Sequence, residues 1–114
     1  MHRIFTTSVA SVFPHYVAKV EKKGRTREEL DAVLTWLTGL SPAEVEAHLE
    51  AGTTFQEFFD AVELNPDVSL ITGSLCGVKV QEVEDPLMRR IRYLDKLVDE
   101  LAKGRPLEKV LRSS

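Results

Sequence analysis

Four side chains in this sequence have the chemistry of a small-molecule site: one imidazole, one phenol and two guanidinium groups. They belong to His15, Tyr16, Arg25 and Arg92. A guanidinium group binds carboxylates and phosphates, and an imidazole or a phenol can move a proton during catalysis. Together these residues would suit the binding of a small anionic ligand, or an enzyme in which His15 or Tyr16 transfers the proton.

Trp36 and Tyr93 are aromatic residues that could line the same cleft while Arg92 binds the anion. In a second interpretation both are core or interface residues whose single polar edge is hydrogen bonded. Spacing does not distinguish the two interpretations, and the structural one is favoured. The ligand-binding candidates are therefore Arg25, Arg92, Trp36 and Tyr93, and the catalytic candidates are His15, Tyr16 and Cys76.

Cys76, the only cysteine, is a candidate for nucleophilic catalysis. A catalytic thiol needs a nearby base, and the three histidines, His2, His15 and His48, are all remote from Cys76 in the sequence. Cys76 lies in an apolar stretch, where an unreactive buried thiol is typical. A single cysteine also excludes an intrachain disulfide and a cysteine-rich metal site.

Metal and cofactor signatures are missing from the sequence. No two histidines have the three- or four-residue spacing that places both rings on one face of a helix. Residues 73–79 include two glycines and Lys79, but they lack the residue order of a phosphate-binding loop. We therefore predict no metal and no cofactor.

Charge is strongly segregated along the chain. Residues 28–78 contain ten carboxylates and no lysine or arginine, whereas residues 1–27 contain six basic residues and one acidic residue. Either the acidic middle folds against its basic neighbours, or the basic run Lys19–Arg27 stays open for an anion beside a predicted helix N-terminus. The many carboxylates and a pI near 5.6 argue against a nucleic-acid partner.

Helix-capping patterns divide the rest of the chain. Thr26, Ser41, Thr54 and Asp85 each stand where a side-chain oxygen can cap a helix, and glutamate follows the first three at the capping-box position. Glycines close three of these helices, and apolar residues at helical spacing follow most of the starts. We predict an all-α fold: a single compact domain, residues 1–114, of about five to seven helices.

Residues 66–84 are ambiguous. Asn65 and Pro66 resemble another helix start, and Ser69, Gly73 and Gly77 would share one face of a helix. Two glycines weaken a helix by roughly 2 kcal/mol together, and residues 78–83 partly alternate as a strand does. Helix is favoured, with one short strand or hairpin near residues 78–83 as the alternative.

Two apolar faces are candidates for contact with a second copy of the chain. One is the heptad-like seam from Leu87 to Leu101, which suits a core helix or a dimer helix, and the other consists of Phe55, Phe58 and Phe59. Because no catalytic signature is present, the leading functional prediction is a helical interaction or regulatory module that self-associates as a homodimer. The alternative is a small-molecule anion-binding protein or enzyme.

The sequence contains no membrane-directed segment. No apolar run approaches the ~18 residues of a membrane helix. The first residues are interrupted by Thr6, Thr7 and Ser8, so they lack the unbroken apolar stretch of a signal sequence. We predict a cytoplasmic protein without a membrane partner.

Four short phrases in order carry a family resemblance. They are Lys23-Gly24-Arg25-Thr26, Trp36-Leu37-Thr38-Gly39, Ser69-Leu70-Ile71-Thr72-Gly73 and Glu84-Asp85-Pro86-Leu87-Met88. With these phrases the chain resembles, essentially end to end, the bacterial family catalogued as domain of unknown function 2200. The resemblance implies a small cytoplasmic bacterial protein that occurs as one domain. It implies no activity, cofactor or catalytic residue.

Overall fold

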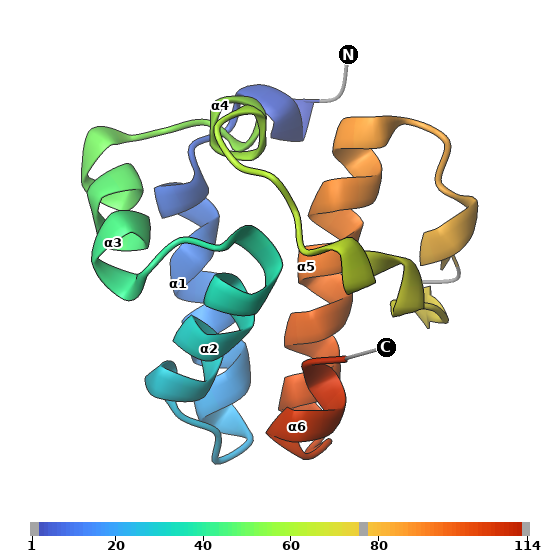
Figure 1. Ribbon diagram of the computed structural model, residues 1–114. Helices are drawn as coiled ribbons and strands as arrows, with labels where there is room; N and C mark the ends of the chain where they lie inside the picture. Colours follow the sequence, from blue (N-terminus) through green and yellow to red (C-terminus); the bar gives the residue numbers. More distant parts are fainter. Residues whose placement is uncertain (1–2, 76–77, 113–114) are drawn as a thin grey trace.

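Six α-helices make up most of the protein, whose computed structural model describes residues 3–75 and 78–112 (Figure 1). The helices are α1 (Val9–Lys22), α2 (Arg27–Thr38), α3 (Pro42–Ala51), α4 (Phe55–Asp60), α5 (Pro86–Ala102) and α6 (Leu107–Val110). The smaller elements are three 3-10 helices, η1 (Arg3–Thr6), η2 (Pro66–Leu70) and η3 (Val80–Glu82), and a hairpin of β1 (Ser74–Leu75) and β2 (Val78–Lys79). The predicted all-α fold is confirmed.

The capping patterns set the ends of the helices. Thr26, Ser41 and Thr54 each accept a hydrogen bond from the backbone amide three residues on, and the glutamate there accepts one from the amide of the cap. Gly39 and Gly52 end α2 and α3 with φ of 75° and 69°, a left-handed conformation that glycine adopts without a Cβ penalty. Helices α2, α3 and α4 therefore begin where the sequence indicated.

Helix α5 is the central element of the fold. It packs against α1, α2, α4 and α6, and α1 runs beside it in the same direction (Figure 1). Its residues Ile91, Leu94, Leu97, Val98 and Leu101 are at most 3 % exposed. Burial of one such side chain stabilises the fold by roughly 2 kcal/mol. All five belong to the single hydrophobic core of the described residues.

Both apolar faces that were candidates for self-association lie inside this core. Phe55, Phe58 and Phe59 are at most 1 % exposed, and the rings of Phe58 and Phe59 meet edge to face at 5.3 Å. The α5 seam is covered by the other helices of the same chain. The prediction that either face forms a contact surface is therefore wrong, because neither is accessible while the core is closed.

The described part of residues 66–84, that is 66–75 and 78–84, does not form the α-helix that the sequence favoured. In the hairpin, Ser74 pairs with Lys79 and Leu75 with Val78 in antiparallel register. Gly73 has φ of 110°, which no α-helix accommodates, and its carbonyl accepts a hydrogen bond from the Val80 amide at 3.0 Å. The alternative of a short hairpin near residues 78–83 is confirmed at β2, whereas Gly77 lies outside the described residues.

Candidate functional site

A cavity of about 270 Å³ lies between α1 and the N-terminal half of α5. Its apolar walls are Ile4, Val12, Met88 and Ile91, and its polar side chains are Tyr16, Arg92 and Asp95. The polar groups come from two helices that pack side by side, one residue from α1 and two from α5. An apolar cavity with a few convergent polar groups is the usual form of a small-molecule site.

A hydrogen bond joins Tyr16 to Asp95 at the wall of this cavity. Tyr16 Oη donates to Asp95 Oδ1 over 2.6 Å. Burial raises the pKa of Tyr16 far above its ordinary value, and the Asp95 carboxylate raises it further, so the phenol stays protonated. Burial also raises the pKa of Asp95, against the opposing effects of the Tyr16 hydrogen bond and the nearby cations. Asp95 is therefore the group of this pair that can gain or lose a proton.

Among the arginines whose side chains the structure describes, Arg92 has the longest distance to its nearest polar partner. Its Nη1 lies 3.9 Å from Asp95 Oδ2, and among the described residues it has no other hydrogen bond or ion pair. Every other arginine whose side chain the structure describes has a polar contact of 3.3 Å or less: Arg25, Arg27, Arg89, Arg90, Arg105 and Arg112. Most N–H donors of Arg92 are therefore free for a ligand at the cavity.

The structure separates the other members of the predicted His/Tyr/Arg site from this cavity. His15 is exposed on α1 and does not line the cavity, although it immediately precedes Tyr16 in the sequence. Arg25 donates to both carboxylate oxygens of Glu29, at 3.2 and 2.7 Å. Cys76 lies outside the described residues. Of the four residues, only Tyr16 and Arg92 come together.

Trp36 and Tyr93 lie away from this cavity. Trp36 Nε1 donates to the carbonyl of Arg112 over 3.1 Å, which is the satisfied polar edge that the structural interpretation expects. Trp36 also borders a second cavity of about 440 Å³. Tyr93 borders a third, of about 520 Å³, together with Arg89 and Arg90. The two aromatic residues therefore do not share a cleft with Arg92.

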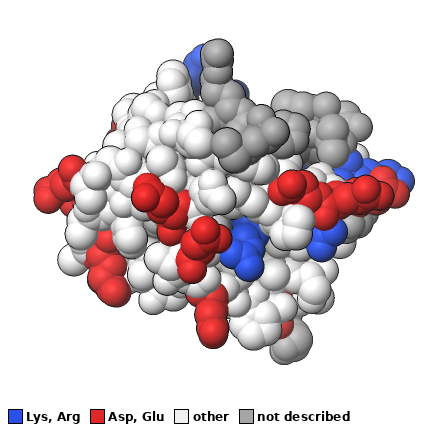
Figure 2. Space-filling view, turned by 90° about the horizontal axis from the view of Figure 1, so that it is seen from above, with Lys and Arg blue, Asp and Glu red and all other residues white. Residues whose placement is uncertain are grey.

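Three of the five basic residues in the run Lys19–Arg27 form ion pairs within the fold. Its ion pairs, with N–O distances of 2.7–3.2 Å, are Lys19–Asp99, Arg25–Glu29, Arg27–Asp31 and Arg27–Glu46. Lys22 and Lys23 are exposed and form no ion pair with a described residue. At the end of the molecule that carries α4, Figure 2 shows acidic side chains distributed over much of the face, with basic side chains between some of them. Carboxylates of residues 28–78 therefore pair with Arg25 and Arg27, whereas Lys19 pairs with Asp99 of α5.

His48 has a structural role. Its Nδ1 lies 3.1 Å from Thr53 Oγ1, and its ring meets Phe58 edge to face at 5.3 Å. The described residues contain no group of three or more histidine, cysteine or acidic side chains that could hold a metal ion. His48 therefore contributes to packing around α4.

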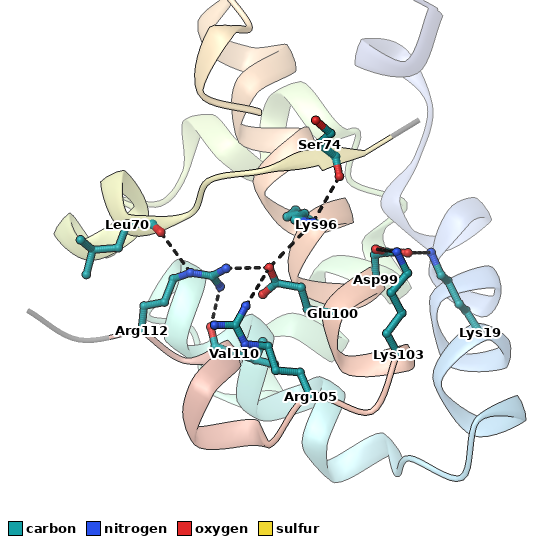
Figure 3. Close-up of polar contacts among 10 residues, drawn as sticks. All are labelled: Lys19, Leu70, Ser74, Lys96, Asp99, Glu100, Lys103, Arg105, Val110 and Arg112. Carbon is teal, nitrogen blue, oxygen red and sulfur yellow. Dashed lines mark hydrogen bonds and ion pairs between the residues drawn. The ribbon is translucent and has the colours of Figure 1, made fainter. Parts of the chain in front are cut away.

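Glu100 is a buried carboxylate that three cations surround (Figure 3). It is 7 % exposed, and its Oε2 lies 2.7 Å from Arg112, 3.3 Å from Arg105 and 3.9 Å from Lys96. Its Oε1 has no hydrogen-bond partner among the described residues. Glu100 is thus the charge on which Lys96 of α5 and the later residues Arg105 and Arg112 converge.

The cations around Glu100 also hold backbone from three segments. Arg112 donates to the carbonyl of Leu70 at 3.1 Å and to that of Val110 at 3.0 Å, and Lys96 donates to the carbonyl of Ser74 at 3.2 Å (Figure 3). Lys96 Cε and Nζ also lie against Gly73, where a Cβ would meet them at 3.3 and 3.4 Å. The cluster fastens η2, the hairpin and the C-terminal segment to α5.

Asp99, one turn after Asp95, has the opposite electrostatic environment. Lys19 Nζ lies 3.1 Å from its Oδ1 and Lys103 Nζ lies 3.0 Å from its Oδ2. Burial alone would raise the pKa of Asp99, but the two ammonium groups outweigh burial and hold the pKa below its ordinary value. Two carboxylates on one helix therefore have pKa values displaced in opposite directions.

Asparagine at these two positions is expected to change stability with pH in opposite directions. The raised pKa of Asp95 means that the folded protein loses stability as pH rises through that pKa, so Asp95→Asn gains stability relative to the original protein with rising pH. The lowered pKa of Asp99 means that its contribution is lost as pH falls, so Asp99→Asn loses relative stability with rising pH. Urea unfolding between about pH 3 and pH 7 measures both trends. Trends of the same sign would contradict the two environments.

Asp95 is the site residue that sequence reasoning did not select. A signal was present, because Asp95 follows Arg92 by three positions and therefore shares a helix face with it. That face also carries Met88 and Ile91, two of the apolar residues of the cavity. The sequence did not show that this face of α5 lies against Tyr16 of α1.

Comparisons with known proteins give the chain a family. No curated protein matches it. A crystal structure of the uncharacterized protein SP1917 shares the fold with a TM-score of 0.90 and 42 % sequence identity, over 97 % of this chain and 93 % of that chain. The family model described as "Uncharacterized protein conserved in bacteria (DUF2200)" matches residues 3–112. The chain therefore belongs to this bacterial family, domain of unknown function 2200, as its sequence phrases indicated.

Proposed function

We propose that the protein binds a small carboxylate with an apolar body in the cavity between α1 and α5. The observation that carries this proposal is the guanidinium group of Arg92. It borders an apolar cavity, and its one ion pair among the described residues is the 3.9 Å contact with Asp95. A guanidinium group with free N–H donors binds a carboxylate through two parallel hydrogen bonds.

The walls of the cavity limit the body of the ligand. Ile4, Val12, Met88 and Ile91 are apolar, so they favour a hydrocarbon group over a polar one. The volume of about 270 Å³ lies just under the usual range of ligand pockets, roughly 300–1,000 Å³. The ligand therefore has a short or branched chain or a single ring.

Tyr16 and Asp95 tune the polar end of the cavity. The phenol is held by its 2.6 Å hydrogen bond to Asp95, so it is not a mobile base. A carboxylate bound at Arg92 would repel the charge of Asp95 and favour its protonated form. Binding is then accompanied by proton uptake and strengthens as pH falls, down to the pKa of the ligand itself. We propose binding without a reaction, since His15 does not line the cavity.

Replacement of Arg92 by glutamine is expected to weaken carboxylate binding at least about tenfold, because a charge-assisted pair of hydrogen bonds is lost. Isothermal titration calorimetry with isovalerate and phenylacetate measures this effect, and the matched primary amides test the requirement for charge. Lys22→Gln, at an exposed lysine of α1 with no ion pair in the described structure, removes the same charge and should leave affinity unchanged. Equal binding of acids and amides, or equal loss in both variants, would refute the proposal.

That the protein is a self-associating interaction or regulatory module stays a prediction. The two apolar faces first suggested as its contact surfaces are buried in the core. Leu70, 41 % exposed, is the one large apolar residue that the described surface exposes. A homodimer would therefore need a more polar interface than the α5 seam or the Phe55/Phe58/Phe59 face offered. Sedimentation equilibrium of the full chain tests for it.

A cytoplasmic location also stays a prediction. Within residues 3–75 and 78–112, no helix combines the length and apolar character that crossing a membrane requires. In the basic run Lys19–Arg27, Lys22 and Lys23 have no ion pair among the described residues. Arg89, Arg90 and Arg92 also lack a close carboxylate partner among the described residues, but they border two cavities that share no residue. Binding of nucleic-acid phosphates needs one broad unpaired basic face, so the expectation that nucleic acid is not the partner stays a prediction.

A further inference from the structure

The third cavity, of about 520 Å³, lies on the opposite side of α5 from the proposed carboxylate site. Its residues from α5 are Pro86, Arg89, Arg90 and Tyr93, and the segment that follows α4 supplies Val62, Glu63, Leu64 and Val68. In Figure 1 this segment descends from α4 toward the middle of α5. The volume lies within the usual range of ligand pockets, roughly 300–1,000 Å³.

Backbone carbonyls hold both guanidinium groups of this cavity in place. Arg89 Nε donates to the carbonyl of Val83 over 2.6 Å, and Arg90 Nη1 donates to the carbonyl of Phe59 over 2.9 Å. Each contact uses one of the five N–H donors of a guanidinium group. The two cations are therefore oriented in advance and keep most of their donors for a ligand.

The charge of this arginine pair is not neutralised within the described structure. Arg89 and Arg90 are half-buried, and neither forms an ion pair with a described carboxylate. Glu63, the one acidic residue of the cavity, is exposed and does not pair with them. A backbone carbonyl accepts a hydrogen bond from a guanidinium group but does not neutralise its positive charge. A partly buried cation is therefore stabilised most by a negatively charged oxygen.

Tyr93 adds an aromatic surface one turn after Arg89. The residue is half-buried at the wall of the cavity, and its hydroxyl has no hydrogen bond in the part of the chain that the structure describes. Val62, Leu64 and Val68 supply apolar surface in the same cavity. An aromatic ring packs favourably against such a wall by offset or edge-to-face contact.

We infer that this cavity binds a phosphate monoester whose organic group is an aromatic ring. The phosphate of such an ester carries close to two negative charges at neutral pH, which matches two guanidinium groups better than a single carboxylate does. The aromatic ring of this ligand packs against Tyr93 and the apolar wall of the cavity. The inference does not rest on the carboxylate site, since the two cavities share no residue.

Phenyl phosphate is the probe that tests this site, by ¹H–¹⁵N NMR titration of the full chain at low salt. We expect Arg89→Gln and Arg90→Gln each to weaken its binding at least about tenfold, because each removes a charge-assisted contact. Arg90→Lys retains the charge, so it should weaken binding less than Arg90→Gln. Lys109→Gln, at an exposed lysine of α6 without an ion pair among the described residues, should bind like the original protein.

Titrations with inorganic phosphate and with phenol test the phosphate group and the aromatic ring of the probe separately. Weaker binding by both than by phenyl phosphate supports a site that uses charge and ring together. Absence of phenyl phosphate binding to the original protein would overturn the inference, as would an equal loss in Lys109→Gln, which would indicate non-specific attraction. Equally tight binding of inorganic phosphate would overturn the role of Tyr93. Titrations with isovalerate report on the other cavity, so either proposal can fail alone.

Discussion

Replacement of Glu100 by glutamine is expected to lower the free energy of unfolding by about 3 kcal/mol. The change removes the only carboxylate that Arg112, Arg105 and Lys96 share in the described structure. The side chains of Arg112 and Lys96 are only 11 % and 13 % exposed, so water cannot fully replace the lost counter-charge. Partly buried cations left without a counter-charge are among the most destabilising changes in a protein. Urea unfolding at neutral pH measures the loss.

Glu108→Gln is the matched control for this prediction. Glu108 is exposed on α6 and forms no ion pair with a described residue, so its replacement should change stability by no more than about 0.5 kcal/mol. The double variant Glu100→Gln/Arg112→Gln should lose less unfolding free energy than the sum of the losses in the two single variants. The reason is that both changes remove the same ion pair. A loss under about 1 kcal/mol in Glu100→Gln would contradict the description of Glu100 as the charge that joins three segments to α5.

Replacement of Phe59 by alanine is expected to destabilise the protein by about 3–5 kcal/mol. Phe59 is fully buried. Its ring centre lies 6.5 Å from that of Phe55, in a stacked arrangement, and 5.3 Å from that of Phe58, edge to face. Removal of the ring leaves a cavity among residues that pack too densely to close it. Thermal and urea unfolding measure the loss.

The same variant distinguishes a core residue from a contact residue. If the aromatic face belonged to an interface between two copies, Phe59→Ala would reduce association while the folded monomer kept its stability. Leu70→Ala is the control, because Leu70 is 41 % exposed and its truncation should change stability by about 0.5 kcal/mol or less. An unchanged unfolding free energy in Phe59→Ala would contradict the position of this ring in the core.

Helix starts could be predicted from the sequence because capping is local. Thr26, Ser41 and Thr54 satisfy backbone amides within three residues of themselves, so no distant part of the chain is needed to decide where α2, α3 and α4 begin. Asp85 similarly accepts a hydrogen bond from the Met88 amide at the start of α5. The class of fold follows from these starts and the helical spacing of the apolar residues.

Residues 66–84 could not be predicted in the same way. The local signals conflicted, and the contacts that hold the hairpin come from far along the chain, as in the hydrogen bond from Lys96 to the Ser74 carbonyl. Gly73 adopts a positive φ that a helix excludes. Tertiary contacts decide such a segment because its own helix propensity is weak.

The candidate site was predictable only in its residue types. Tyr16 and Arg92 were selected for their chemistry and do line one cavity, but His15 and Arg25 do not. Neighbours in sequence point to different sides of a helix, which separates His15 from the cavity that Tyr16 lines. Asp95 joins the site because α1 and α5 pack side by side, although Asp95 lies 79 positions after Tyr16 in the sequence.

The sequence by itself determined the helical class, most helix boundaries and the segregation of charge along the chain. Only the tertiary structure decided that the apolar seams form a core rather than an interface. It also decided that Lys19 and Arg27 are neutralised while Arg89, Arg90 and Arg92 lack a close carboxylate partner among the described residues. The physical reason is that spacing defines which side chains share a face, whereas the packing of the whole chain determines what covers that face.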